Sequence, residues 1–311
     1  DVQPYALPYL DDRYCAKKFP SNFDREWSCP TEYDENALGG FAADAALADV
    51  EVDIDTLPKL ISSNADVCVV VTRRVAGKPY HKYFCNGAHS MSDPHETWSS
   101  SKIFAMSNAA GKLRTECASA GVDGAVDGKY GGTPLGDLAT VVCSYDSTAG
   151  YSSNSLSSYF HDLGWRDRML SLVAGDWLGR SGESLGGNYG EASPSDLDFV
   201  VYCSDGNECV AAKDQSSPYT NTLSTLSSVE MTRRIAQYRD IPESLRFPNA
   251  TWSDMQSILY GSDTSVLFPS TSWGGMSADT AIYVQSALDI NDVEITSDGR
   301  WRIFSKLGIF I

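Results

Sequence analysis

Two cysteines flank a stretch that has the pattern of a two-stranded hairpin, and this stretch constrains the fold more than any other. Val67–Thr72 and Tyr80–Cys85 are strand-like runs rich in β-branched and aromatic residues. Between them, a two-residue turn at Ala76-Gly77 would reverse the chain. That turn places Cys68 directly opposite Cys85. We therefore expect an antiparallel hairpin closed by a cross-strand disulfide.

The chain holds eight cysteines, an even number that suits an oxidising compartment. Cys203 and Cys209 flank a turn-forming Asp-Gly-Asn stretch, which favours a small disulfide loop. The simplest remaining pairs are Cys15–Cys29 and Cys117–Cys143, although spacing alone does not prove connectivity, and buried free thiols are the alternative. The expected localisation is secreted, either extracellular or periplasmic.

Charge excludes two classes of partner. The 311 residues include 24 basic and 41 acidic side chains, which gives a formal net charge of −17. Such a chain repels a phosphate backbone and an anionic lipid surface, so we expect neither nucleic acid nor membrane as partner. No uncharged apolar run approaches the roughly 20 residues that span a bilayer.

The order of elements predicts an α+β fold, an antiparallel sheet with flanking helices plus a mostly helical subdomain. Residues 1–60 are expected to form an N-terminal extension with one helix between Glu35 and Asp55. Residues 61–311 form the main domain, with a sheet part at about 61–114 and 283–311 and a helical part at about 115–282. The last segment, Gly299–Ile311, alternates as a strand and is expected to share the hairpin's sheet. Apolar residues at helical spacing predict helices at Ser99–Arg114, Leu135–Cys143, Ser155–Leu163, Arg166–Val173, Ser224–Tyr238 and Trp252–Leu259.

Three short motifs carry the chemistry. Ser99 and Lys102 lie three residues apart where a helix opens, so they share one helix face and the amine can reach the hydroxyl. A lysine acts as a base only when neutral, which requires a pKa well below about 10.4. Ser152-Ser153-Asn154 and Lys306-Leu307-Gly308 follow in order, and Lys306 is the candidate cation that lowers this pKa.

With these motifs in this order, the chain resembles the penicillin-recognising serine hydrolases, which include serine β-lactamases, DD-peptidases and penicillin-binding proteins. The resemblance covers about Asp66 to the last residue. It implies that Ser99 is acylated, Lys102 is its base, Ser152 relays a proton and Lys306 acts electrostatically. It also implies that Asn154 binds the substrate amide and that the N–H groups of Ser99 and Ile309 form the oxyanion hole. Gly308 must be small so that its strand can approach the substrate.

The chain departs from the family pattern in four places. Leu307 replaces a threonine that grips the substrate carboxylate. Glu183 lies about where the family holds its water-activating glutamate, but with the wrong local spacing, and a solvated loop residue is the alternative. The family's sheet continues beyond the third motif, so a second polypeptide that completes the C-terminal part is expected. Ser144-Tyr145-Asp146 is a rival for the second motif.

Other catalytic patterns are weaker. Gly182–Gly186 matches the Gly-x-Ser-x-Gly nucleophile elbow around Ser184, but no strand precedes it and no histidine follows His161. The four histidines show no metal-ligand spacing, so no metal or cofactor is expected.

The sequence therefore predicts a secreted serine hydrolase acting on an amide or ester of a peptide-like substrate, of DD-peptidase, esterase or amidase type. The alternatives are a β-lactamase, a β-lactam-binding sensor or scaffold that acylates without turnover, and a non-catalytic secreted binding protein.

Overall fold

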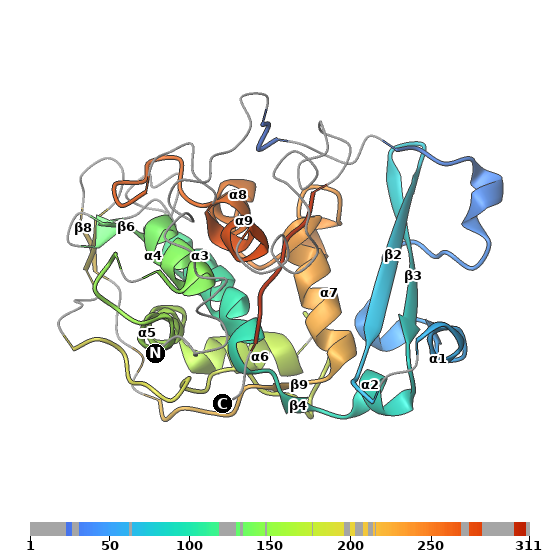
Figure 1. Ribbon diagram of the computed structural model, residues 1–311, viewed down its shortest axis with the longest axis horizontal. Helices are drawn as coiled ribbons and strands as arrows, with labels where there is room; N and C mark the ends of the chain where they lie inside the picture. Colours follow the sequence, from blue (N-terminus) through green and yellow to red (C-terminus); the bar gives the residue numbers. More distant parts are fainter. Residues whose placement is uncertain are drawn as a thin grey trace.

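A long hairpin stands at one side of the molecule and a group of packed helices at the other (Figure 1). The fold is α+β, as predicted. The computed structural model describes residues 23–26, 31–61, 64–117, 129–130, 133–146, 148–175, 177–195, 200–202, 208–210, 214, 216–268, 274–281 and 302–308.

The hairpin is built as the sequence predicts. Strands β2 (Cys68–Val75) and β3 (Lys78–Cys85) are antiparallel, with Cys68 opposite Cys85. Ala76 and Gly77 both have positive φ, 49° and 75°, which suits a two-residue turn between strongly twisted strands. The predicted disulfide is present. Strand β1 (Val52–Asp53) adds in parallel to the other edge of β3, so the strand order is β1-β3-β2.

The helical part is organised around α3. This helix contacts α4, α5 and α8, and α4 packs in turn against α9. The helices are α1 (Leu57–Leu60), α2 (Ala88–Ser92), α3 (Lys102–Cys117), α4 (Leu135–Ser144), α5 (Ser153–Gly164), α6 (Arg166–Ala174), α7 (Thr225–Ala236), α8 (Trp252–Tyr260) and α9 (Gly275–Asp279). The six helices predicted from apolar spacing are confirmed, although Ser99 and the two residues after it form a 3₁₀ turn ahead of α3. None of the described helices is long and apolar enough to cross a membrane.

Local signals explain several helix starts. Ser152 and Ser224 are the N-caps of α5 and α7, and each accepts a hydrogen bond from a backbone N–H in the first turn. Thr251 and Asp254 form a capping box at the start of α8. Every residue of α4 is buried, as expected for an apolar helix in the middle of a core.

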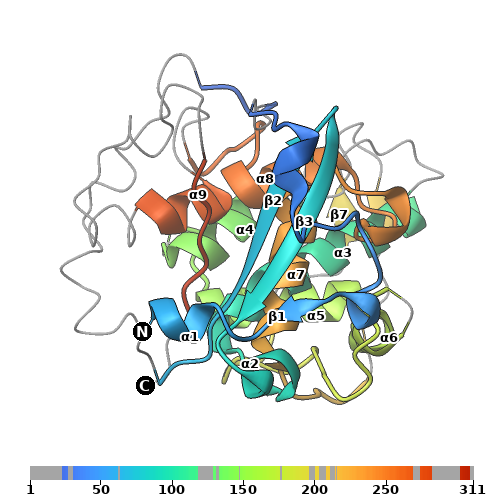
Figure 2. The same cartoon turned by 90° about the vertical axis from the view of Figure 1, so that its right-hand side faces the viewer.

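Helix α7 joins the two halves of the molecule. It packs against β2, and Figure 2 shows it behind the hairpin. The Tyr83 hydroxyl donates to Glu230 at 2.8 Å, and Arg233 lies 2.9 Å from the ring nitrogen of His81. Because Asp44 pairs with both Arg233 and His81, these polar groups compensate one another inside the core.

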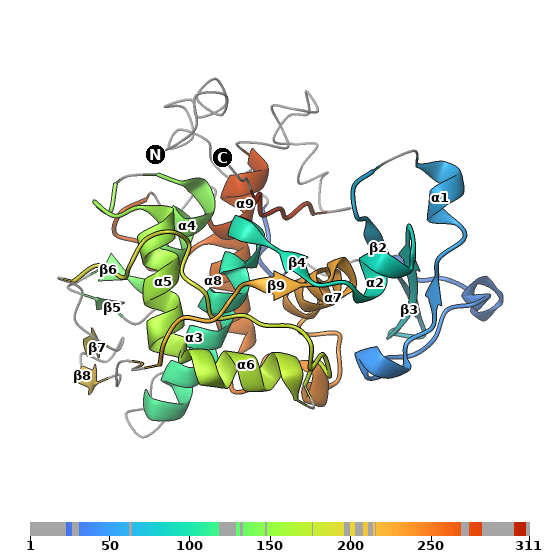
Figure 3. The same ribbon diagram turned by 90° about the horizontal axis from the view of Figure 1, so that it is seen from below.

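Short strands lie under and beside the helices (Figure 3). One pair is β4 (His95–Glu96) with β9 (Thr222–Leu223). A second sheet has the order β6-β5-β7-β8 and consists of Thr133–Pro134, Lys129–Tyr130, Val200–Tyr202 and Glu208–Val210. This second sheet falls within residues predicted to be mostly helical.

Two predictions near the chain ends do not hold. Instead of a helix, the stretch from Glu35 to Asp55 contains two 3₁₀ turns, Glu35–Leu38 and Leu47–Asp49, because Gly39 and Gly40 interrupt it and Gly40 has a φ of 74°. Residues 302–308 have no regular secondary structure and form no strand pair within the described part of the chain, so the predicted sharing of a sheet with the hairpin is not observed there.

The remaining cysteine predictions have different outcomes. Cys143 is a buried free thiol, so the predicted Cys117–Cys143 disulfide is wrong. Cys117 ends α3, whereas Cys143 is close enough to Lys102 and Lys306 to interact with them electrostatically near the start of that helix. The Cys15–Cys29 and Cys203–Cys209 pairs each involve residues outside the described part.

Candidate active site

Ser99 lies in a 3₁₀ turn, Trp98–Ser101, that runs directly into α3. With about three residues per turn, this geometry places Ser99 and Lys102 on the same side of the turn, but no hydrogen bond joins the Ser99 hydroxyl to the Lys102 amine within the described residues. Ser99 is half-buried, and its hydroxyl forms no hydrogen bond with the described residues. Trp98 immediately before it has a φ of 45°, a strained value for a side chain of this size. The turn therefore presents an unengaged hydroxyl at the entrance of the helix.

The amine of Lys102 is fully buried and held by two acceptors. It donates to Ser153 Oγ at 3.0 Å and to Asn154 Oδ1 at 2.6 Å. Ser153 Oγ itself donates to the carbonyl of Val142 at 2.8 Å, so it accepts from the lysine. A neutral amine has two hydrogens and one lone pair. With both hydrogens engaged, the lone pair remains to accept a hydroxyl proton.

Burial sets the protonation state of this amine. Desolvation and, after it, the nearby charge of Lys306 lower the pKa of Lys102 to about 6, while Glu191 and Cys143 act in the opposite direction. At neutral pH the amine is mostly unprotonated. A base of this pKa is suited to taking a proton from a hydroxyl near pH 7.

Lys306 remains a cation although its side chain is only 2% exposed. Burial by itself lowers the pKa of Lys306, but Asp279, Tyr145 and Cys143 together outweigh this, and the pKa is raised. The ammonium lies 3.6 Å from Asp279 and donates to the Tyr145 hydroxyl at 2.8 Å. Both lysines face the Tyr145 ring, with amines 5.4 Å and 4.4 Å from its centroid.

Gly308 brings the last segment against the start of α3. A Cβ at this position would lie 3.0 Å from both the Ser100 nitrogen and the Thr97 carbonyl oxygen. A Cβ here would force these backbone atoms to move by a few tenths of an ångström, so the turn that carries Ser99 is what favours glycine at this position. Ile309, predicted to complete the oxyanion hole, lies outside the described residues.

In the second motif, Ser152-Ser153-Asn154, the serine that contacts Lys102 is one residue later than predicted. Ser152, the predicted proton relay, caps α5 and donates to Glu191, and no bond joins it to Lys102. Ser153 contacts the lysine instead. Asn154 is in contact with Lys102 as well, so its oxygen is committed to the amine.

Glu183 is held away from these groups. One of its carboxylate oxygens accepts from Arg180 at 2.9 Å, from Ser224 at 2.7 Å and from Ser227 at 2.9 Å. This buried set ties the loop to the start of α7. None of its bonds reaches Ser99, Lys102 or Lys306 within the described residues.

Three neighbours of Lys102 were not assigned from the sequence. Glu191 is half-buried and acts electrostatically on Lys102. Tyr145 belongs to the rival motif and ends α4 in a left-handed conformation. The Tyr189 ring lies 5.1 Å from the amine, and its hydroxyl lies 3.1 Å from Ser101 Oγ and 3.3 Å from His161 Nε2. Burial lowers the pKa of His161 to about 3, so this ring adds no charge.

The rival nucleophile has none of the required surroundings. Ser184 forms a backbone bridge with Thr222, and its hydroxyl donates to the Thr220 carbonyl at 3.1 Å. No helix begins directly after it, and no hydrogen bond joins its hydroxyl to a histidine within the described residues. In the described residues, no cluster of three histidine, cysteine or acidic side chains is arranged for a metal ion.

Comparisons with protein-family models, curated proteins and solved structures find no match for this chain. The resemblance to the penicillin-recognising enzymes therefore depends on the motifs of this chain and on their order along it.

Proposed function

We propose that this protein is a serine hydrolase that forms an acyl-enzyme on Ser99, with Lys102 as the general base. The observation that supports it most is the state of Lys102: a buried amine with a pKa of about 6, its hydrogens engaged by Ser153 and Asn154, one turn from an unengaged serine. A neutral lysine one turn from a serine fits the pair of base and nucleophile that covalent catalysis requires.

The reaction follows from these positions. As Ser99 Oγ bonds to the substrate carbonyl carbon, its proton moves to the Lys102 amine and the carbonyl oxygen becomes an oxyanion. The Ser99 N–H and the positive end of α3 stabilise that charge. When the intermediate collapses, the bond to the leaving nitrogen or oxygen breaks and the proton on Lys102 transfers to it. Water then hydrolyses the ester on Ser99.

The favoured substrate is an amide or ester of a peptide-like molecule. Lys306 is engaged by Asp279 and Tyr145, and Leu307 offers no hydroxyl, so a substrate carboxylate has no obvious partner among the described residues. This favours an esterase, amidase or peptidase over an efficient β-lactamase. The Cys68–Cys85 disulfide supports an extracellular or periplasmic location.

A second candidate is a sensor that acylates without turnover. It is favoured by Glu183, the predicted water-activating residue, because its carboxylate is already bound by Arg180, Ser224 and Ser227.

Hydrolysis of a p-nitrophenyl ester and of a chromogenic β-lactam distinguishes these functions. The proposal expects steady turnover of the ester that Ser99→Ala abolishes and Ser184→Ala leaves intact. A single stoichiometric burst with no turnover identifies the sensor. Equal rates for wild type and Ser99→Ala would refute both.

A further inference from the structure

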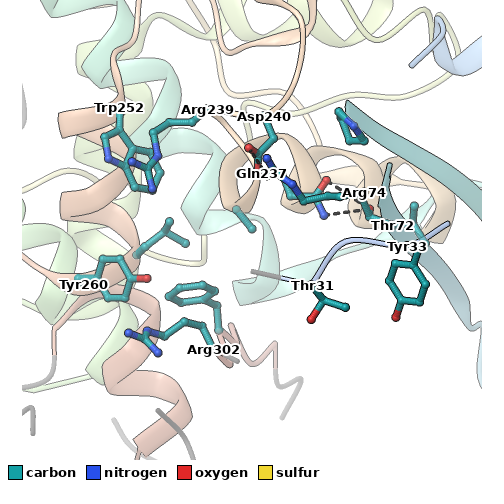
Figure 4. A pocket seen from close by; sticks show the side chains of 15 residues that line it. Thr31, Tyr33, Thr72, Arg74, Gln237, Arg239, Asp240, Trp252, Tyr260 and Arg302 are labelled. Carbon is teal, nitrogen blue, oxygen red and sulfur yellow. Dashed lines mark hydrogen bonds and ion pairs between the residues drawn. The ribbon is translucent and has the colours of Figure 1, made fainter. Parts of the chain in front are cut away.

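The turn that carries Ser99 is held by side chains packed around it. The larger described cavity, of about 370 Å³, lies beside the hairpin (Figure 4), and neither Ser99 nor Lys102 lines it. Hydrogen bonds join the turn instead to the loop of residues 186–189. The position of Ser99 is therefore set by what holds this loop and this turn together.

Asn221 makes the first connection between the loop and the turn. Its backbone carbonyl accepts from the Thr97 N–H at 2.9 Å and from the Thr97 hydroxyl at 3.1 Å. Its side-chain oxygen accepts from the N–H groups of Gly186 and Gly187 at 3.1 Å and 2.9 Å. The residue just before the Trp98–Ser101 turn is thus tied to the loop that leads to Tyr189.

Tyr189 makes the second connection, and the direction of its hydrogen bonds can be assigned. Ser101 Oγ donates its one hydrogen to the Trp98 carbonyl at 2.8 Å, so at 3.1 Å it accepts from the Tyr189 hydroxyl. Neutral His161 has one ring N–H. On Nε2, 3.3 Å from the Tyr189 oxygen, this N–H has an acceptor, whereas Nδ1 has no partner among the described residues. The three bonds therefore run from His161 to the Trp98 carbonyl.

The Trp98 carbonyl and the Ser99 N–H belong to the same peptide group. No described peptide bond is cis, so this C=O and this N–H point in opposite directions within one plane. A contact that fixes the carbonyl therefore also fixes the direction of the N–H. The φ of Trp98, 45°, is a strained value that persists only where surrounding contacts hold it. No hydrogen bond within the described residues engages the Ser99 N–H itself.

We propose that Tyr189 is a positioning residue, whose hydroxyl acts through Ser101 and the Trp98 carbonyl to aim the Ser99 N–H at the oxyanion. This role rests on the proposed function, in which that N–H stabilises the developing charge. The Tyr189 ring lies 5.1 Å from the Lys102 amine, so the ring faces the base while the hydroxyl holds the turn of the nucleophile. Removing the hydroxyl alone separates these two contacts.

Tyr189→Phe removes the hydroxyl and keeps the ring. Tyr83→Phe is the matched control, because it also loses a buried hydroxyl bond, 2.8 Å to Glu230, away from Ser99. With a p-nitrophenyl ester, Tyr189→Phe should slow acylation roughly tenfold, less than the roughly 10²–10³-fold cost of removing an oxyanion donor outright. The pH of half-maximal acylation should not move, because the surroundings of the Lys102 amine are kept. Tyr83→Phe should acylate like the wild type.

A thionoester of the same acid distinguishes aiming of the N–H from general distortion, because sulfur is a weak acceptor of hydrogen bonds. Tyr189→Phe should slow the ester far more than the thionoester, so that the ratio of the two acylation rates falls roughly tenfold. Ser101→Ala should lower this ratio equally, and the double variant should lower it no further. Equal losses with both substrates, additive losses in the double variant, or unchanged rates would overturn the proposal.

Nuclear magnetic resonance tests the same geometry without a substrate. Labelling tryptophan carbonyls with ¹³C and serine nitrogens with ¹⁵N selects the amides of the Trp-Ser pairs at residues 27–28, 98–99 and 252–253. The Ser99 cross-peak, identified by its loss in Ser99→Ala, should move in Tyr189→Phe and stay in place in Tyr83→Phe.

The two measurements separate this inference from the proposed function. A Ser99 cross-peak that stays in place in Tyr189→Phe would overturn the positioning role even where Ser99 hydrolyses the ester. A cross-peak that moves, in a protein whose wild type shows no Ser99-dependent hydrolysis, would support the anchoring of the turn by Tyr189 and refute the proposed function.

Discussion

The amine of Lys102 donates to the side-chain oxygen of Asn154 at 2.6 Å, across 52 positions of sequence. This bond and its companion to Ser153 fix where the hydrogens of a neutral lysine point. They explain why a buried amine is retained here, since an unpartnered polar group in a core is destabilising. The account of catalysis depends on this arrangement.

Replacing Lys102 with methionine should slow acylation of Ser99 by roughly 10²–10⁴-fold, the usual contribution of a general base. Lys112→Met is the matched control, because this second buried lysine of α3 is paired with Glu116 at 2.5 Å. It should leave the acylation rate unchanged. Stopped-flow measurement of the burst with a p-nitrophenyl ester compares the two. Similar losses in both variants would mean that α3 has been perturbed generally.

The same replacement should stabilise the fold at neutral pH. The unfolded amine keeps its proton up to a pH of about 10.4, whereas the folded amine, with a pKa of about 6, releases it. Between these values the unfolded state binds one more proton, so the free energy of unfolding of the wild type rises with pH. Lys102→Met removes this effect. Urea unfolding at pH 7 should show a gain of roughly 2–4 kcal/mol that shrinks toward pH 9.

The charge of Lys306 should set the pH at which acylation becomes half-maximal. Because this cation lowers the pKa of Lys102, its removal should move the midpoint to higher pH. Lys306→Met combined with Asp279→Asn avoids an unpaired buried carboxylate. The pH profile of ester acylation measures the shift. A midpoint that stays in place would show that Lys306 does not act on Lys102.

Glu191→Gln should shift the same midpoint in the opposite direction. Its carboxylate raises the pKa of Lys102, so neutralising it should lower the pH of half-maximal acylation. Glu183→Gln is the control. It should leave the midpoint unchanged but lower thermal stability, because it weakens the buried contacts with Arg180, Ser224 and Ser227. A shift of the acylation midpoint in Glu183→Gln would instead mean that Glu183 acts on Lys102 and belongs to the candidate active site.

Gly308→Ala should impair acylation through the backbone. The added Cβ would lie 3.0 Å from the Ser100 nitrogen and the Thr97 oxygen, so the turn that carries Ser99 must move. A loss of stability of roughly 1–3 kcal/mol is expected. Gly182→Ala, where nothing lies within 4 Å of the added carbon, should affect neither property.

The hairpin and the main helices follow from local patterns. A two-residue turn sets the register of the hairpin and places Cys68 opposite Cys85. The spacing of apolar residues places the helices within a few residues of their observed bounds. Ser99 and Lys102 can be identified from the sequence as a candidate pair because they lie three residues apart, within one helical turn.

The rest of the site depends on contacts that spacing does not encode. Whether Ser152 or Ser153 meets the lysine is decided by which serine caps α5. Tyr145 and Glu191 approach Lys102 only through the packing of α4, α5 and the loop after Tyr189. Cys143 is unpaired because α4 places it near the start of α3, whereas Cys117 lies at the end of α3. The number and spacing of cysteines in the sequence do not predict this separation.

Covalent labelling tests the central claim most directly. The protein is incubated with a fluorophosphonate, digested, and the modified peptide is sequenced by mass spectrometry. The account predicts one label per chain, on Ser99, that Lys102→Met largely suppresses at pH 7. Label on Ser184 or another serine, or no label on the folded wild type, would contradict it.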